Sequence, residues 1–357
     1  MSNTTTLEFY SDLIPNECSL DYDPFWEAII YLGTVFYLGI ACLLHFVIIR
    51  TVMVTDKKHF QNNSFFKIIV MDSIASIILI LNELFFNKLF TYITPLCPIV
   101  GPFFWRPSVI LNIVYISLNH ARFSKSVTQI FMVLNRMTCV LIPTEYDRVI
   151  WRSLTPISCV LVVILPCGGM WNVWISRVFL QPYRGGFNIG YLKTVRWPRG
   201  QKLNAYLESA FSQLKSKSQA ALSLFQSIYI LTALFFTVVC SSITFFKLIF
   251  LPARIKSAEK SLCFTSVFIS STFLMVAATQ VRRISYSVNT NFQLSFAFCL
   301  SCDREIMYLL QALAFDLFTV GPAVIIVMTS KKIRESLFWW KEQSTKKISV
   351  ISVSGLL

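Results

Sequence analysis

Charge is scarce in this chain of 357 residues. Charged side chains make up 14% of the sequence, whereas about 25% is usual in soluble globular domains. No lysine or arginine precedes Arg50, and Met1 to Phe25 carries five acids. A secretory signal peptide would begin with basic residues ahead of a short apolar core. The first apolar run is therefore expected to stay in the protein as a membrane anchor.

Catalytic and metal-binding motifs are missing as well. The sequence has no GxSxG, HExxH or phosphate-cradling glycine loop, the patterns that place a nucleophile, a zinc ion or a phosphate. Its ten cysteines do not form the paired CxxC motifs of a zinc site, and His45 and His120 each lack a second ligand at metal spacing. We expect no enzyme activity, no cofactor and no metal site.

Hydrophobic residues, by contrast, account for 55% of the chain. The net charge of +14 could indicate a nucleic-acid partner, but nucleic-acid domains gather lysine and arginine on one polar face. Here the basic residues lie between long apolar runs, where they would orient helices. The sequence thus predicts a protein that is solvated mainly by membrane lipid and binds no nucleic acid.

Seven apolar runs are long enough to cross a membrane, which takes about 20 residues of helix. They are Ala28 to Ile49, Ile68 to Phe86, Leu118 to Leu141, Leu154 to Ile175, Gln219 to Phe246, Ser261 to Val281 and Ile306 to Thr329. The pattern predicts an all-α fold, a bundle of seven transmembrane helices within residues 26–330. Residues 1–25 and 331–357 would be tails.

A further stretch, Ile99 to Ser117, is also apolar apart from Arg106 and could be counted as an eighth span. Four residues, Pro98, Gly101, Pro102 and Pro107, argue against a regular helix through its first half. We therefore expect seven spans, with the helix of the third span beginning near Ser108.

Basic residues set the orientation, because lysine and arginine are enriched in cytoplasmic loops and the first helix usually dominates. Arg50 and Lys57 follow the first span, and a basic tail follows the last. These residues predict an outer N-terminus and an inner C-terminus, although the connection between the fourth and fifth spans is also basic. The tail's apolar residues fall on one helical face, which favours an amphipathic helix on the inner membrane surface; a disordered tail is the alternative.

With an outer N-terminus, Asn3 should carry a glycan, whereas the sequon at Asn62 should face the cytoplasm. The oxidising exterior would also contain four cysteines, and we expect at least one disulfide among them. They are Cys18, Cys97, Cys299 and Cys302. Pairing of Cys299 with Cys302 is the local option, and Cys97 joined to another loop would brace the outer mouth.

The most informative motif runs from Leu134 to Pro143 (LNRMTCVLIP) and is followed by Tyr146 and Trp151. An arginine at the inner end of a third span, then a proline and an aromatic residue, resembles the cytoplasmic switch of G-protein-coupled receptors. Together with the stretch Gln181 to Phe187 (QPYRGGF), this motif makes the chain similar to nematode serpentine receptors of the gamma class. The resemblance covers nearly the whole chain.

That resemblance implies a chemosensory receptor in the plasma membrane of sensory cells, coupling a small-molecule or peptide ligand to a heterotrimeric G protein. The coupling surface would comprise Asn135, Arg136, Tyr146, Arg254 and Lys256. Many such receptors place an acid before the arginine, where this chain has asparagine, so the resting lock would be weaker or would be supplied by Glu145 or Asp147. Arg136 could instead only mark the membrane boundary.

In the last span, Pro322 permits a kink. The resemblance implies a hinge there, and a packing defect tolerated in lipid is the alternative. Ligand pockets of bundles form between helices, which makes Tyr115, Asn119 and Arg122 candidate ligand contacts, or otherwise packing residues.

Asp72 and Lys125 are expected to form a buried ion pair. With a rise of 1.5 Å per residue, Lys125 lies about 16 Å along its helix from Arg136, and Asp72 about 12 Å from Ser64. Both would lie at similar depth in antiparallel neighbours, where an isolated charge costs on the order of 3 kcal/mol. Lys125 could instead snorkel, or Arg122 could compete for the acid.

Charges within spans also occur in transporters and ligand-gated channels, which are the alternative function. A structural or trafficking membrane protein is a third possibility. Many transporters show internal repeats and broken helices, and the sequence shows neither pattern. The receptor interpretation is therefore favoured.

Overall fold

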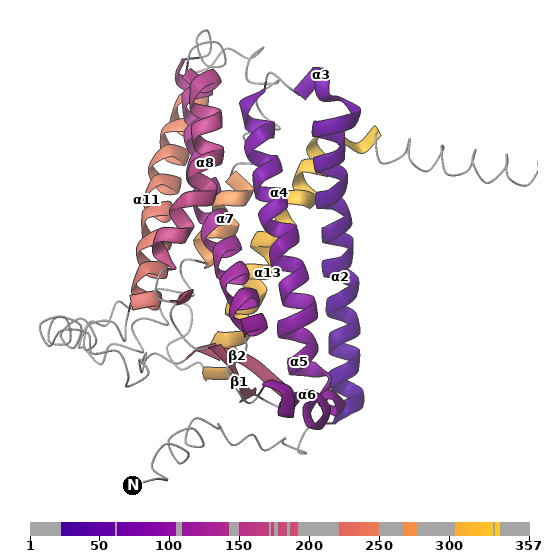
Figure 1. Cartoon of the computed structure of the whole chain (residues 1–357). Coiled ribbons are helices and arrows are strands. Elements are labelled where there is room, and N and C mark those ends of the chain that lie inside the picture. The colour runs from indigo at the N-terminus through magenta and orange to yellow at the C-terminus, as the bar shows by residue number, and fades with distance from the viewer. Residues whose placement is uncertain are drawn as a thin grey trace, which may run out of the picture. The chain divides into compact units, whose positions relative to one another are not determined.

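The computed structural model describes residues 23–60, 63–104, 109–142, 150–170, 173–174, 178–183, 186–191, 221–249, 267–276, 304–330 and 333–335. Six long helices dominate these residues (Figure 1). They are α2 (Pro24–Arg50), α4 (Ser64–Asn82), α7 (Val109–Leu141), α8 (Trp151–Gly169), α11 (Ala221–Ile249) and α13 (Arg304–Thr329).

Each of the seven expected spans contains helix among the described residues, so the chain is an all-α bundle. Five helical segments are long and apolar enough to cross a membrane: Pro24–Thr55, Ser64–Tyr92, Trp151–Gly169, Ile228–Lys247 and Ala312–Thr329. The third expected span lies within α7, a helix of 33 residues that carries three basic side chains. The described part of the sixth is the shorter apolar helix Val267–Val276.

Two of the helices continue into π-helical turns that apolar spacing does not reveal. The first is α2, which runs on into η1 (Thr51–Thr55), and the second is α4, which runs on through η2 (Glu83–Lys88) into α5 (Leu89–Tyr92). Single π-helical turns inside α-helices occur frequently at functional sites. Here η2 begins at Glu83, an acid within a span.

The stretch between the second and third spans is more helical than predicted. After the 3-10 turn η3 (Thr94–Leu96), α6 covers Cys97–Phe104, so the expectation of no regular helix there was wrong. Pro98 is tolerated because it lies in the first turn, where a missing N–H removes no helical hydrogen bond. The third-span helix begins at Val109, as expected.

The described residues fall into two compact units, the first drawn from Met1–Gly39, Ile78–Phe123 and Ile164–Ile228. Its β-hairpin was not foreseen in an all-α chain: β1 (Val178–Tyr183) pairs antiparallel with β2 (Gly186–Tyr191). The hairpin packs into a small core with residues of η2, α5, α6 and α7. The buried members are Phe90, Leu111, Val114, Val178, Phe187 and Ile189.

Gly186 explains how the hairpin approaches α5 so closely (Figure 1). The Thr91 hydroxyl donates to the Phe187 carbonyl at 3.0 Å. A Cβ at Gly186 would lie 2.6 Å from the Thr91 carbonyl oxygen and would also collide with the carbonyl of Phe90. Only a residue without a side chain fits there, so Gly186 permits a close backbone contact between the hairpin and α5.

The second unit, drawn from Ile40–Ile77, Ser124–Val163 and Tyr229–Leu357, contains the larger core. Asn63 caps α4, because its side-chain oxygen accepts the Phe65 backbone N–H at 3.1 Å. The buried Trp151 indole donates to the Thr138 hydroxyl at 2.6 Å. Core members include Ile48, Phe60, Phe65, Ile69, Met132, Trp151, Phe273, Phe318 and Ala323.

Candidate functional site

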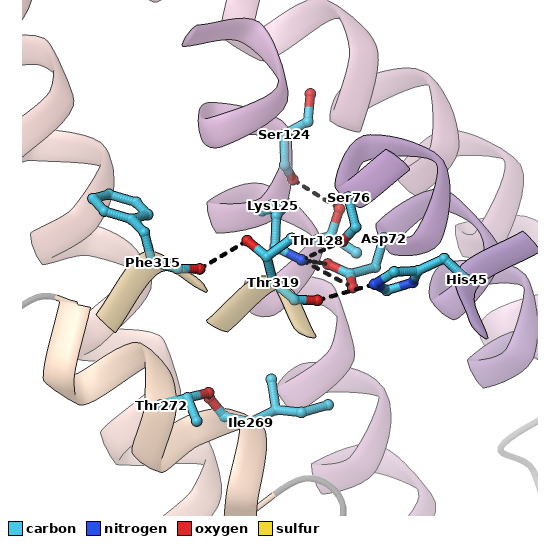
Figure 2. Close-up of polar contacts among 10 residues, drawn as sticks. All are labelled: His45, Asp72, Ser76, Ser124, Lys125, Thr128, Ile269, Thr272, Phe315 and Thr319. Carbon is cyan, nitrogen blue, oxygen red and sulfur yellow. Dashed lines mark hydrogen bonds and ion pairs between the residues drawn. The ribbon is translucent and has the colours of Figure 1, made fainter. Parts of the chain in front are cut away.

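Asp72 of α4 and Lys125 of α7 lie together in the second unit (Figure 2). The lysine Nζ is 3.0 Å from one carboxylate oxygen and 3.2 Å from the other. It also donates to the Ser76 hydroxyl at 2.6 Å. The two charged side chains are only 1% and 5% exposed. The lysine therefore does not snorkel, and its charge is neutralised in place.

A third helix completes the surroundings of Lys125. Its ammonium lies 4.8 Å from the ring centroid of Phe318 on α13, within the range of a cation–π attraction. Burial of an ion pair is costly unless further hydrogen bonds and contacts satisfy it. Asp72, Ser76 and Phe318 together supply these contacts, so one side chain links α4, α7 and α13.

The competitor that the sequence suggested for Asp72 has a different partner. Arg122 Nη2 lies 2.6 Å from a carboxylate oxygen of Glu83, in the first unit, and the other oxygen of that carboxylate accepts from Asn87 at 2.6 Å. The side chains of Arg122 and Glu83 are 25% and 11% exposed. This second ion pair is more exposed than the first. The sequence shows that Glu83 lies within a span, but it does not show that a π-helical turn begins there.

The two other ligand candidates lie on the same helix, α7. Asn119 is buried and donates its amide to the backbone carbonyl of Tyr115 at 2.8 Å, whereas Tyr115 is half-buried and packs against the hairpin core. The Asn119 amide therefore makes its hydrogen bond within its own helix.

His45, set aside in the sequence analysis as a lone histidine, makes a contact between helices. Its Nε2 lies 2.9 Å from the backbone carbonyl oxygen of Thr319 on α13 (Figure 2), and the side chain is buried at 1% exposure. A carbonyl only accepts, so Nε2 must carry the hydrogen. The sequence shows a histidine inside a span, which indicates that the side chain needs a polar partner. It does not reveal the partner, because the acceptor is a backbone carbonyl.

At the far end of α7, two consecutive residues meet two consecutive residues of α4. Asn135 donates its amide to the Ser64 hydroxyl at 3.0 Å. The guanidinium carbon of Arg136 lies 3.4 Å from the ring centroid of Phe65, and Arg136 is 4% exposed. Phe65 was not singled out from sequence, since it is one of 32 phenylalanines.

Pro322 lies buried inside α13. The preceding Gly321 allows the ring of Phe268 to approach, because a Cβ there would lie 2.7 Å from a ring carbon. The predicted residues Asn3, Cys18, Tyr146, Arg254, Lys256, Cys299 and Cys302 fall outside the described residues. Cys97 belongs to α6, but its side chain is not among those described. Within the described residues, no group of three or more His, Cys, Asp or Glu side chains could hold a metal.

Comparison with known proteins identifies the family of this chain. A sequence model of the Srg family of chemoreceptors matches residues 31–337. The chain is 43% identical to serpentine receptor class gamma-17 of Caenorhabditis elegans over 99% of this chain and 98% of that one. It is 45% identical to serpentine receptor class gamma-15 of the same organism, over 97% and 98%. Gamma-16 matches at 45% over 90% and 88%. The chain therefore belongs to the Srg family and is a multi-pass membrane chemoreceptor.

Proposed function

We propose that this chemoreceptor couples the binding of an outer or intramembrane ligand to a heterotrimeric G protein in the cytoplasm. The observation that carries the proposal is the burial of Arg136 against Phe65 near the end of α7. An arginine that only marks a membrane boundary extends its charge toward the interface. Arg136 is instead buried against Phe65, as expected of a side chain that leaves its resting position when it binds a partner.

In this proposal the stack against Phe65 holds Arg136 at rest; Glu145 and Asp147, the acids named in the sequence analysis, lie outside the described residues. A guanidinium over an aromatic face gains about 0.5–2 kcal/mol, more when desolvated, which is small enough for a protein partner to outcompete. We infer that Arg136, Asn135 and Tyr146, with the basic residues Arg254 and Lys256, form the surface that the G protein contacts.

For the ligand we propose the region of Tyr115, Asn119 and Arg122, on one side of α7. Support comes from the Arg122–Glu83 ion pair, which is partly exposed, and from the π-helical turn that begins at Glu83. A partly exposed pair can exchange one partner for a polar group of a small molecule or peptide at modest cost.

The orientation that this proposal requires has a direct test. Of the sequons at Asn3 and Asn62, only Asn3 should carry sugar, because glycans are added on the outer face. Asn3→Gln should then remove the whole glycan shift on a denaturing gel, and Asn62→Gln should leave it unchanged. A glycan at Asn62 would show that the orientation is the opposite of the one proposed, with Arg136 outside the cytoplasm.

Coupling itself is tested by expressing the full chain with a panel of G proteins and screening small molecules and peptides. We expect a ligand-dependent signal with at least one G protein. Recording membrane current in cells without added G protein is the matched measurement. A ligand-evoked current without any G-protein signal would replace the receptor proposal with a ligand-gated channel.

A further inference from the structure

Two contacts reach consecutive residues of α13. The Lys125 ammonium lies over the ring of Phe318 at 4.8 Å, and the His45 Nε2–H donates to the carbonyl of Thr319 at 2.9 Å (Figure 2). Only Val320 separates these residues from the Gly321–Pro322 pair. Side chains from α2 and α7 therefore hold α13 within one turn of its proline.

That turn of α13 is weak for reasons of covalent chemistry. Pro322 has no N–H to donate to the carbonyl of Phe318, four residues earlier, and its ring pushes that carbonyl away. Gly321 adds backbone freedom. The Thr319 hydroxyl donates to the Phe315 carbonyl at 2.8 Å, a back-bond that tends to bend helices. A helix turn before a proline can tilt its carbonyls outward, where a donor from another helix can reach them.

His45 supplies such a donor. Backbone groups in a membrane protein must be satisfied internally, because no water is at hand. The imidazole is buried, and its Nδ1 has no hydrogen-bond partner among the described residues, so the contact to Thr319 is the single hydrogen bond that this side chain makes there. The side chain is thus placed to fix how far α13 opens at Pro322.

We propose that His45 is a positioning residue that latches α13 in its resting bend at Pro322, and that signalling requires release of this hydrogen bond. The proposal rests on the receptor function above. Lys125 over Phe318 holds the same turn from a second side, so the part of α13 before the proline stays fixed. The part after Pro322 is then the part that moves.

The first test compares variants that differ only in the donor. His45→Phe keeps the ring volume but has no N–H, His45→Gln places an amide nitrogen close to the position of Nε2, and His45→Asn places it one bond short. Losing one hydrogen bond of ordinary strength should raise the ligand-independent signal roughly three- to tenfold in the Phe and Asn variants. His45→Gln should behave like the wild type, as should the lipid-exposed neighbour Phe46→Leu, which is 51% exposed in the parent.

Hydrogen exchange on the purified full chain in lipid nanodiscs supplies a readout that needs no G protein. Backbone amides after Pro322 should exchange about threefold or more faster in His45→Phe and not in His45→Gln. If His45→Phe exchanges faster but the receptor activates no G protein, the proposed role of His45 stands and the proposed G-protein coupling is wrong. Unchanged exchange in His45→Phe overturns the latch.

A double-mutant cycle with Pro322→Ala identifies the partner of His45. Alanine restores the N–H that closes the turn onto Phe318, so adding His45→Phe to that background should change exchange by less than about twofold. Coupled sites are non-additive in this way. If His45→Phe has the same effect in both backgrounds, the histidine does not act through the proline turn and the proposal is wrong.

Discussion

Exchanging the charges of Asp72 and Lys125 is expected to restore the surface delivery that either single reversal abolishes. Asp72→Lys would place two ammonium groups where the structure has a carboxylate 3.0 Å from one ammonium, and Lys125→Asp would place two carboxylates there. Removing one partner of a buried pair costs about 3–5 kcal/mol, and a like charge costs more. Each single variant should therefore reach the surface at less than about a tenth of the wild-type level.

The double variant restores opposite charges on the same two helices. Ser76 can then donate to the new carboxylate, since a hydroxyl both donates and accepts. The swap moves the cation off α7, however, and so gives up its contact with the Phe318 ring at 4.8 Å. Recovery should therefore be substantial but incomplete, at about half of the wild-type surface level or more, given the modest strength of one cation–π contact.

The Glu83–Arg122 pair is the matched control, measured by surface labelling and by glycan maturation in the same cells. Its side chains are 11% and 25% exposed, compared with 5% and 1% for Asp72 and Lys125, so a reversed charge there is less completely buried. Glu83→Arg and Arg122→Glu should consequently lower surface delivery far less than the Asp72 and Lys125 reversals. If both deep reversals are defective and the double variant stays defective, Asp72 and Lys125 depend on different partners.

Helix depth explains why the Asp72–Lys125 contact could be anticipated from the sequence. The rise per residue is fixed, and a charge inside a membrane needs a partner. Few pairs of opposite charges lie at equal depth on neighbouring helices, so the candidate ion pairs are few. Arg122 was harder to assign, because two acids, Asp72 and Glu83, were available to it. The choice depends on helix rotation, and the π-helical turn at Glu83 alters that rotation without leaving a mark in the apolar pattern.

The contacts that sequence reasoning missed involve partners that carry no distinguishing residue type. His45 donates to a backbone carbonyl, and every residue has one. Phe65 binds Arg136 through an ordinary aromatic face in a chain rich in phenylalanine. The hairpin was missed because β1 and β2 lie between apolar runs that dominate the composition. Apolar run length predicted the spans well, since membrane thickness leaves few alternatives.

Arg136→Ala is expected to abolish G-protein signalling while the protein still reaches the surface. Truncating a charged side chain that a partner binds costs about 2–5 kcal/mol of interface energy, which corresponds to a loss of about thirtyfold or more. Folding should tolerate the change, because Phe65 keeps its other neighbours, such as Phe66 at 5.8 Å between ring centroids. Signal per surface receptor is the measurement.

Phe65→Leu tests the resting contact of Arg136 separately from its contact with the G protein. Leucine preserves burial but offers no ring face, so the arginine should be released more readily and the ligand-independent signal should rise about threefold, in line with the 0.5–2 kcal/mol of a cation–π contact. Phe65→Tyr keeps the face and should leave the signal unchanged. Arg152→Ala, an exposed arginine on α8, controls for loss of positive charge. Undiminished signalling by Arg136→Ala at normal surface level would remove Arg136 from the coupling mechanism, whatever Phe65→Leu does.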